Sequence, residues 1–195
     1  MKKSSYNPQI HHRRSIRLPN YDYSQPGYYF ITICTKNRDC LLGVTKNNKI
    51  ELSPIGEIAK QCWLDIPKHY PHTRLDEYII MPNHVHGIIL AEFNNVAGAH
   101  VGAIHELPLR VPLPHTKIFR RRMLIPKIIG RFKMNSAKII NQLCNTQGIP
   151  FWQRNYYEHI IRNKESLYRI RQYIKNNPKN WINDSNNPDN KKSTK

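Results

Sequence analysis

Two histidines stand one residue apart in the apolar run MPNHVHGIIL, residues 81–90. Successive side chains of a β-strand point to opposite faces, so in a strand His84 and His86 share one face while Val85 points to the other. Two neutral imidazoles side by side can contribute to a metal site or can simply pack together. For an isolated pattern of this kind packing is the commoner explanation, so other parts of the chain have to decide.

Composition indicates the kind of partner. The chain has 195 residues, with 31 Lys and Arg against 13 Asp and Glu, which gives a formal net charge of +18. A charge this large favours nucleic acid, because each phosphate contact releases condensed counterions. Anionic membranes could attract the same charge. However, the 11 Tyr, 5 Phe and 3 Trp interleave with the basic residues, which suits stacking on unpaired bases better than contact with lipid.

The length and the cysteines limit the organisation. With 39% hydrophobic residues, the chain can bury one core, and a single domain with tails is expected. There is no apolar stretch of about 18 residues and no signal-peptide pattern, which predicts a cytoplasmic protein without a membrane anchor. The cysteines form no CxxC pair, so neither a zinc ribbon nor a disulfide framework is indicated. We expect reduced thiols at Cys34, Cys40, Cys62 and Cys144.

The first half of the domain alternates β-like and helical patterns. Residues 28–36, 40–44 and 49–53 favour strands, with a tight turn at 45–49. A helix is expected to start at Ser53 as N-cap with Pro54 in its first turn, and to end before Pro67. The run LDEYIIMPNHVHGIILAEF, residues 75–93, is predicted to be one central strand, with a bulge or bend at Pro82 and Asn83.

The second half follows the same logic. Residues 94–117 have no clear periodicity and are expected to be a long loop or insertion. Helical periodicity predicts a helix over 125–144, β character returns over 149–162, and a last helix should run from Asn163 as its cap to just before Pro178. This order predicts an antiparallel sheet backed by helices.

Three motifs resemble one family. His84-Val85-His86 resembles the HUH motif of single-tyrosine nucleases and transposases, and MPNHVHGII is similar to its form in REP-associated tyrosine transposases. The segments FWQRNYYEHIIRN (151–163) and YIKNNPKNW (173–181) resemble the same family in order and spacing. The match runs from about Gly27 to Trp181, interrupted by 94–117. It implies a ferredoxin-like (RRM-like) α+β domain, with the HUH motif on a central strand and the nucleophilic tyrosine on a C-terminal helix.

The resemblance also implies an activity and boundaries. Family members cut single-stranded DNA beside a hairpin and transfer the strand, using one tyrosine and a divalent cation, Mg²⁺ or Mn²⁺. Here the catalytic domain would span 25–182, between a basic N-terminal arm (1–24) and a polar basic C-terminal tail (183–195). Single-stranded or hairpin DNA is then the expected partner, with no membrane, and the protein would be a monomer or a homodimer.

The resemblance implies roles for individual residues. His84 and His86 would bind the metal, and the nucleophile falls in the segment QYIKNNP, which gives Tyr173. The family's third ligand comes four residues later, on the same helix face, which gives Asn177. Related insertion-sequence enzymes often have glutamine there, so the shorter Asn177 could ligate directly or through a water. Tyr168 with Gln172 is a rival pair with the same spacing.

The neighbouring tyrosines and the basic residues complete the candidate site. Tyr156 and Tyr157 lie on a predicted strand, where one of them must face the core, so neither is the preferred nucleophile. Arg154, Arg162 and Lys175 lie within the matched motifs and are the predicted DNA contacts.

Two other classes of function fit parts of the sequence. A nucleic-acid-binding domain without catalysis would need only the charge and the aromatic residues. A metal-dependent nuclease that uses water would need only the histidine pair. Covalent attachment of cleaved DNA to protein separates both from the transposase.

Overall fold

The computed structural model describes residues 25–92 and 123–191. The predicted N-terminal arm and the loop predicted over 94–117 lie outside the described residues. The described elements, in chain order, are β1 Gly27–Cys34, η1 Lys36–Arg38, β2 Gly43–Lys46, β3 Lys49–Leu52, α2 Pro54–Leu64, α3 Ile66–His69, β4 Thr73–Ile80, β5 His84–Ala91, α5 Leu124–Cys144, β6 Tyr157–Ile161, α6 Lys164–Asn176, η2 Trp181–Asn183 and η3 Pro188–Lys191.

The main sheet has four strands in the order β4-β5-β1-β6, and every neighbouring pair is antiparallel. Leaving aside the separate β2–β3 hairpin, the short α3 and the C-terminal α6, the chain order is β1, α2, β4, β5, α5, β6. This is the βαββαβ arrangement of ferredoxin-like domains, in which the first and third strands lie at the centre. The predicted fold class is therefore confirmed, and the two histidines lie on a central strand, β5.

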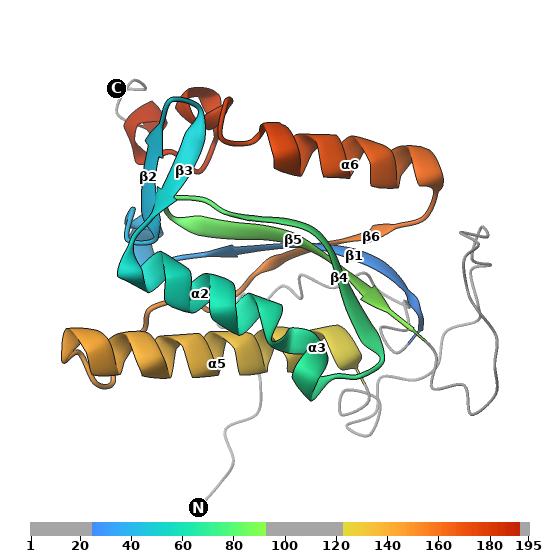
Figure 1. Ribbon diagram of the computed structural model, residues 1–195, viewed down its shortest axis with the longest axis horizontal. Helices are drawn as coiled ribbons and strands as arrows, with labels where there is room; N and C mark the ends of the chain where they lie inside the picture. The colour runs from blue at the N-terminus through green and yellow to red at the C-terminus, as the bar shows by residue number, and fades with distance from the viewer. Residues whose placement is uncertain (1–24, 93–122, 192–195) are drawn as a thin grey trace, which may run out of the picture.

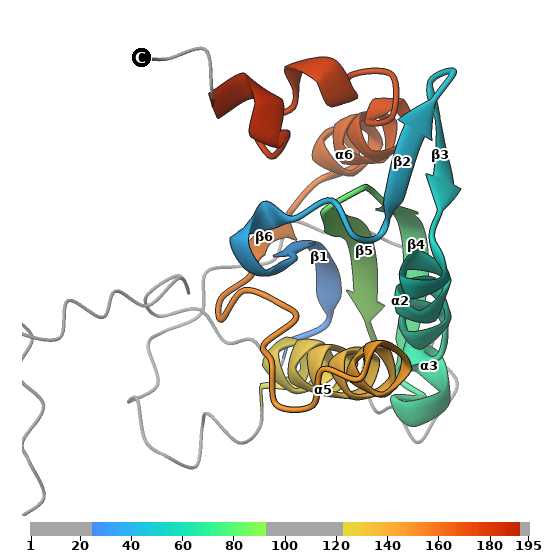
Figure 2. The same ribbon diagram turned by 90° about the vertical axis from the view of Figure 1, so that its left-hand side faces the viewer.

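The helices form two layers around this sheet (Figure 1). Helices α2, α3 and α5 cover one face, while α6 and the C-terminal 3₁₀ turns lie over the other, as the end-on view in Figure 2 shows. Side chains of β1 alternate accordingly: Tyr29, Ile31 and Ile33 belong to the larger core under α2 and α5, and Phe30 belongs to a smaller one under α6. None of the described helices is long and apolar enough to cross a membrane.

Helix α2 begins as its sequence predicts. The Ser53 hydroxyl accepts a hydrogen bond from the Gly56 amide, and Pro54 occupies the first turn. Near the end of the helix, Trp63 is fully buried. Its ring lies against β5 at Gly87, where a Cβ atom would come within 2.2 Å of Trp63 Cζ2. Glycine next to the histidine pair thus lets α2 pack closely under the strand that carries it.

The prediction of one strand over 75–93 was wrong. The segment forms two strands, β4 and β5, that pair as a hairpin. Pro82 lacks an amide hydrogen, and the Met81 amide donates to the carbonyl of His84 (2.8 Å), which closes the turn. As a result, His84 is the first residue of a strand rather than the middle of one.

The β prediction for 149–162 was right only at its C-terminal part. Strand β6 starts at Tyr157, and Trp152 makes only an isolated bridge to Thr35. The segment between them is held from α5, because the Lys133 ammonium donates to the carbonyls of Gln153 (2.5 Å) and Arg154 (2.9 Å). These bonds occupy backbone acceptors that a strand ladder would otherwise use.

Candidate metal and tyrosine site

His84 and His86 lie at the start of β5 and face the layer that contains α6. Both side chains are buried, at 0% and 2% exposure. Their ring centroids are 4.4 Å apart. The shared face follows from strand alternation, as predicted, and the neighbouring strand β1 supplies Thr32 opposite His86 in the register.

Asn83 fixes the orientation of the His84 ring. Its side-chain nitrogen lies 2.8 Å from each of two carbonyl oxygens, those of Arg38 and Asn186. Carbonyls only accept, so the amide nitrogen must face them and the amide oxygen must face His84, whose Nδ1 is 2.8 Å away. Nδ1 of His84 therefore carries the proton, and the Nε2 lone pair is left available.

His86 is held in a similar way from β1. Thr32 Oγ1 lies 2.8 Å from Nδ1 of His86, and the phenol oxygen of Tyr173 lies 3.3 Å from Nε2. The ring also stacks on Phe30, with centroids 5.3 Å apart. Nε2, the ring nitrogen that Thr32 does not contact, is thus the one that meets the predicted nucleophile.

Both imidazoles are neutral at neutral pH. Burial, with a smaller contribution from the Arg38 charge, lowers the pKa of His84 to about 3. Burial and the neighbouring His84 likewise lower the pKa of His86 well below its usual value, against the opposing charge of Asp184. A neutral imidazole is the form that ligates metals, so no proton has to be displaced first.

Helix α6 brings Tyr173 to the histidines. Its ring is 46% exposed, with its centroid 5.2 Å from that of His86. Burial and the Asp184 charge raise the pKa of the phenol, while a hydrogen bond with the Asn177 side chain opposes them. The rival Tyr168 is 63% exposed. It precedes Tyr173 by five residues on α6, so its side chain points to another flank of the helix.

Asn177 directly follows α6, where the helix ends before Pro178. The residue is 2% exposed, and its Oδ1 atom is buried without a hydrogen-bond partner among the described residues. Nε2 of His84 is likewise buried without a hydrogen-bond partner among the described residues. Buried acceptors of this kind are costly unless something donates to them or binds them.

Asp184 is a candidate site residue that the sequence did not suggest. It follows η2, in the segment predicted to be a polar tail, and its carboxylate with the two imidazoles forms a cluster whose ligand atoms lie within 4.8 Å of one another. The Asn186 amide donates to its Oδ1 (2.6 Å). The only available signal was its charge, because Asp184 is an acidic residue among asparagines just after the matched segment.

These donors fit a divalent cation. Two imidazole nitrogens and one carboxylate converge near Tyr173, and the Asn177 side chain hydrogen-bonds the phenol. Nε2 of His84 and Oδ1 of Asn177 have no hydrogen-bond partner among the described residues. Such a mixed nitrogen and oxygen set suits Mg²⁺ or Mn²⁺ with waters and phosphate in the remaining positions.

The predicted DNA contacts are exposed, but no described contact joins them to the histidines. Arg154 lies in the segment before β6, and Arg162 lies between β6 and α6. Lys175 on α6 pairs with Glu77, at 2.9 Å. A role for Lys175 in DNA binding stays a prediction, and it would compete with this ion pair.

No family model matches the chain, but individual proteins do. An uncharacterized protein of Haemophilus influenzae is 43% identical over 181 residues, which cover 93% of this chain and 96% of that protein. A second protein of the same organism, provisionally named a REP-associated tyrosine transposase, is 25% identical over 163 residues, or 83% of this chain and 76% of the relative. Over most of its length the chain is therefore similar in sequence to a protein named as a REP-associated tyrosine transposase.

Two solved structures also resemble the chain. One is a REP-associated tyrosine transposase bound to a REP hairpin, with a TM-score of 0.49, 16% identity, and coverage of 87% of this chain and 74% of that one. The other is a provisionally assigned transposase from Deinococcus radiodurans, with a TM-score of 0.44, 18% identity, and coverage of 78% and 91%.

Proposed function

We propose that this protein is a REP-associated tyrosine transposase that cuts single-stranded DNA next to a hairpin and rejoins it through a covalent 5′-phosphotyrosine. The observation that carries the proposal is the contact of Tyr173 with His86, in a cluster with His84 and Asp184. A phenol, two neutral imidazoles and a carboxylate are groups that phosphoryl transfer can use. A purely structural role explains them less well, because buried acceptors without partners destabilise a packed core.

His84, His86 and Asp184 would hold a divalent cation, with Asn177 as a further ligand, directly or through a water. When bound, the ion neutralises charge on a phosphate oxygen and fixes the phosphate beside the nucleophile. Asn83 and Thr32 contact the Nδ1 atoms of His84 and His86 and so orient both rings, as hydrogen-bond partners of metal-binding histidines do. Nε2 of His86 faces the phenol at 3.3 Å, so a cation held by this atom would take the place of that hydrogen bond and would lie beside the Tyr173 oxygen.

Tyr173 would be the nucleophile. Its oxygen loses its proton to solvent and bonds to phosphorus, and the bond from phosphorus to the 3′ oxygen breaks, which releases a 3′-hydroxyl. Attack by another 3′-hydroxyl reverses the step and frees the tyrosine, so neither ATP nor an external nucleophile is consumed. The phenol has a raised pKa, which makes positioning rather than free phenolate the main source of rate.

Arg154 and Arg162 are proposed to contact DNA phosphates. Both side chains are exposed, and the chain as a whole carries +18. Binding should therefore weaken steeply with salt, because each neutralised phosphate releases counterions. Unpaired bases have exposed faces for aromatic residues, which favours a single-stranded flank over a duplex.

The test uses an oligonucleotide with a hairpin and a single-stranded flank, labelled at its 3′ end. The protein, Mg²⁺ or Mn²⁺ and this DNA should give a labelled protein band on a denaturing gel, and His84→Ala and His86→Ala should retain binding but give no band. The fully paired duplex of the same sequence should give none. A shortened free fragment without a protein band would instead indicate a water nucleophile, and a shift on a native gel alone would indicate a binding domain without catalysis.

A further inference from the structure

Strand β4 contains a bulge at the place where α6 crosses it. The strand pairs regularly with β5 up to Leu75 opposite Ile89 and again from Tyr78 opposite Gly87, so β4 has one more residue than its partner in between. Leu75 and Tyr78 both pack against the core under α2 and α5. Without the bulge, residues three apart would point to opposite faces.

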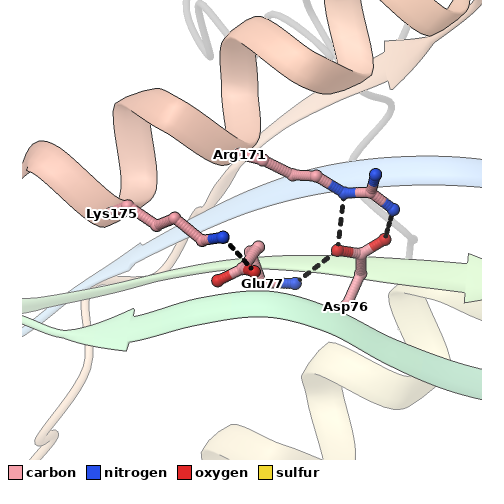
Figure 3. A network of polar contacts seen from close by, with 4 residues as sticks. All are labelled: Asp76, Glu77, Arg171 and Lys175. Carbon is pink, nitrogen blue, oxygen red and sulfur yellow. Dashed lines mark hydrogen bonds and ion pairs between the residues drawn. The ribbon is translucent and has the colours of Figure 1, made fainter.

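The bulge turns two consecutive carboxylates toward α6. In a regular strand one of Asp76 and Glu77 would face away from the helix, but here both form ion pairs with it, as Figure 3 shows. Arg171 binds both oxygens of Asp76, with Nε to Oδ1 at 2.9 Å and a terminal nitrogen to Oδ2 at 2.5 Å. Lys175 lies 2.9 Å from Glu77. We call these contacts the β4–α6 ion pairs.

The β4–α6 ion pairs and the tyrosine lie on opposite flanks of the helix. Each residue advances about 100° around an α-helix, so Arg171 and Lys175 share one flank while Tyr173 lies about 160–200° from them. The apolar stripe of Leu167, Ile170 and Ile174 faces the sheet between the two flanks. The stripe turns one side of α6 toward the sheet, and ion pairs on one flank limit how far the helix can rotate about its axis around that position.

We propose that the β4–α6 ion pairs set the rotation of α6 and thereby hold the Tyr173 oxygen at His86. The inference rests on the proposed function, because it makes Asp76, Glu77, Arg171 and Lys175 positioning residues for the nucleophile. The bidentate Arg171–Asp76 pair suits this task, since it constrains direction as well as distance. The Asp76 side chain is only 16% exposed, so this pair is better shielded from solvent than an ordinary surface pair.

The test compares Asp76→Asn and Glu77→Gln with Glu51→Gln, which removes an exposed ion pair with Lys46 in the β2–β3 hairpin. We expect each β4 variant to lower the first-order rate of adduct formation at saturating DNA about tenfold or more, since small displacements of a reacting group have large effects on rate. The dissociation constant for hairpin DNA should stay within about twofold of the wild-type value, because neither carboxylate contacts DNA in this account. The Glu51→Gln control should match the wild type in both measurements.

A second readout does not depend on catalysis. In protein labelled with 3-fluorotyrosine, the ¹⁹F signal of Tyr173, assigned with Tyr173→Phe, should shift or broaden in Asp76→Asn and Glu77→Gln but not in Glu51→Gln. Glu77→Lys and Lys175→Glu should each disturb the Tyr173 signal. The double variant reverses the charges of the ion pair and should return the signal to its wild-type position. If wild-type protein forms no adduct, the proposed function fails, and this signal still decides the positioning.

Two results would overturn the inference. One is an unchanged ¹⁹F signal together with an unchanged adduct rate in both β4 variants. The other is a Lys175→Glu variant that loses DNA affinity but keeps the Tyr173 signal at its wild-type position, with no recovery of affinity when Glu77→Lys is added. That second result would assign Lys175 to a DNA phosphate.

Discussion

Asn83 Oδ1 lies 2.8 Å from Nδ1 of His84, and the nitrogen of the same side-chain amide donates to two backbone carbonyls. The arrangement leaves one tautomer for His84, with Nε2 as the free acceptor. Asn83 itself is fully buried and joins the turn before β5 to η1 and to the C-terminal segment. The orientation of a proposed metal ligand therefore depends on parts of the chain that are far apart in sequence.

Removing the Asn83 amide should weaken metal binding. In Asn83→Ala the His84 ring loses its acceptor, and we expect Mn²⁺ affinity, measured by isothermal titration calorimetry, to fall about 10–100-fold. Asn83→Asp should be less stable than the wild type, because a carboxylate oxygen would face two carbonyl oxygens. It should keep most of the Mn²⁺ affinity, because the other carboxylate oxygen still accepts from Nδ1–H of His84. The matched control is Asn141→Ala, which removes an amide on α5 that donates to the backbone carbonyl of Ile149. Equal affinity in Asn83→Ala and wild-type protein would show that Asn83 does not act on the ligand.

Asp184 should contribute charge to the same site. Asp184→Asn keeps the shape of the side chain but removes the only carboxylate in the described cluster, so Mn²⁺ affinity should fall about tenfold or more. Asp189→Asn, five residues later in the same segment, should leave affinity unchanged. If the two variants bind Mn²⁺ equally well, Asp184 is not a ligand.

The Asp76–Arg171 pair should show in the acid stability of the protein. Burial raises the pKa of the Asp76 carboxyl, but hydrogen bonds from Arg171 and the Glu77 amide, with the charges of Arg171 and Lys175, outweigh it, and the pKa is lowered. Ionised Asp76 therefore stabilises the fold above its unfolded pKa of about 4, and this contribution is lost as the pH falls through the lower folded value.

Urea unfolding of wild-type protein and Asp76→Asn at several pH values measures this contribution. The variant should be less stable by about 1 kcal/mol at pH 7, allowing for solvent screening of the partly exposed Arg171. The difference in free energy of unfolding should shrink toward zero as the pH falls below the unfolded pKa of about 4 and through the lower folded value. A difference that stays constant over this range would mean that the ionised carboxylate is not its source.

Local sequence patterns predicted the elements that have local signals. Ser53 and Asn163 cap α2 and α6 through their side chains, as expected from residue type alone. The hairpin of β4 and β5 was missed because Met81 and Pro82 keep the run apolar through its turn, so hydropathy does not fall where the chain reverses.

The site was predictable to a similar extent. Strand alternation placed His84 and His86 on one face, and helical spacing placed Tyr173 and Asn177 together. The contribution of Asp184 depends on the chain returning to the sheet after α6, and no local pattern encodes that return. The same is true of the bulge at Asp76 and Glu77, because an inserted residue is visible only against the partner strand.

The most direct test of the account is the identity of the residue that becomes attached to DNA. After reaction with a 3′-labelled hairpin substrate, tryptic digestion and mass spectrometry should find the adduct on the peptide QYIK, residues 172–175, and Tyr173→Phe should fold and bind DNA but give no adduct. This expectation follows from the 3.3 Å contact of the Tyr173 oxygen with His86. An adduct on ESLYR, residues 165–169, would contradict it, since the nucleophile would then be Tyr168 and Gln172 would become the candidate third ligand.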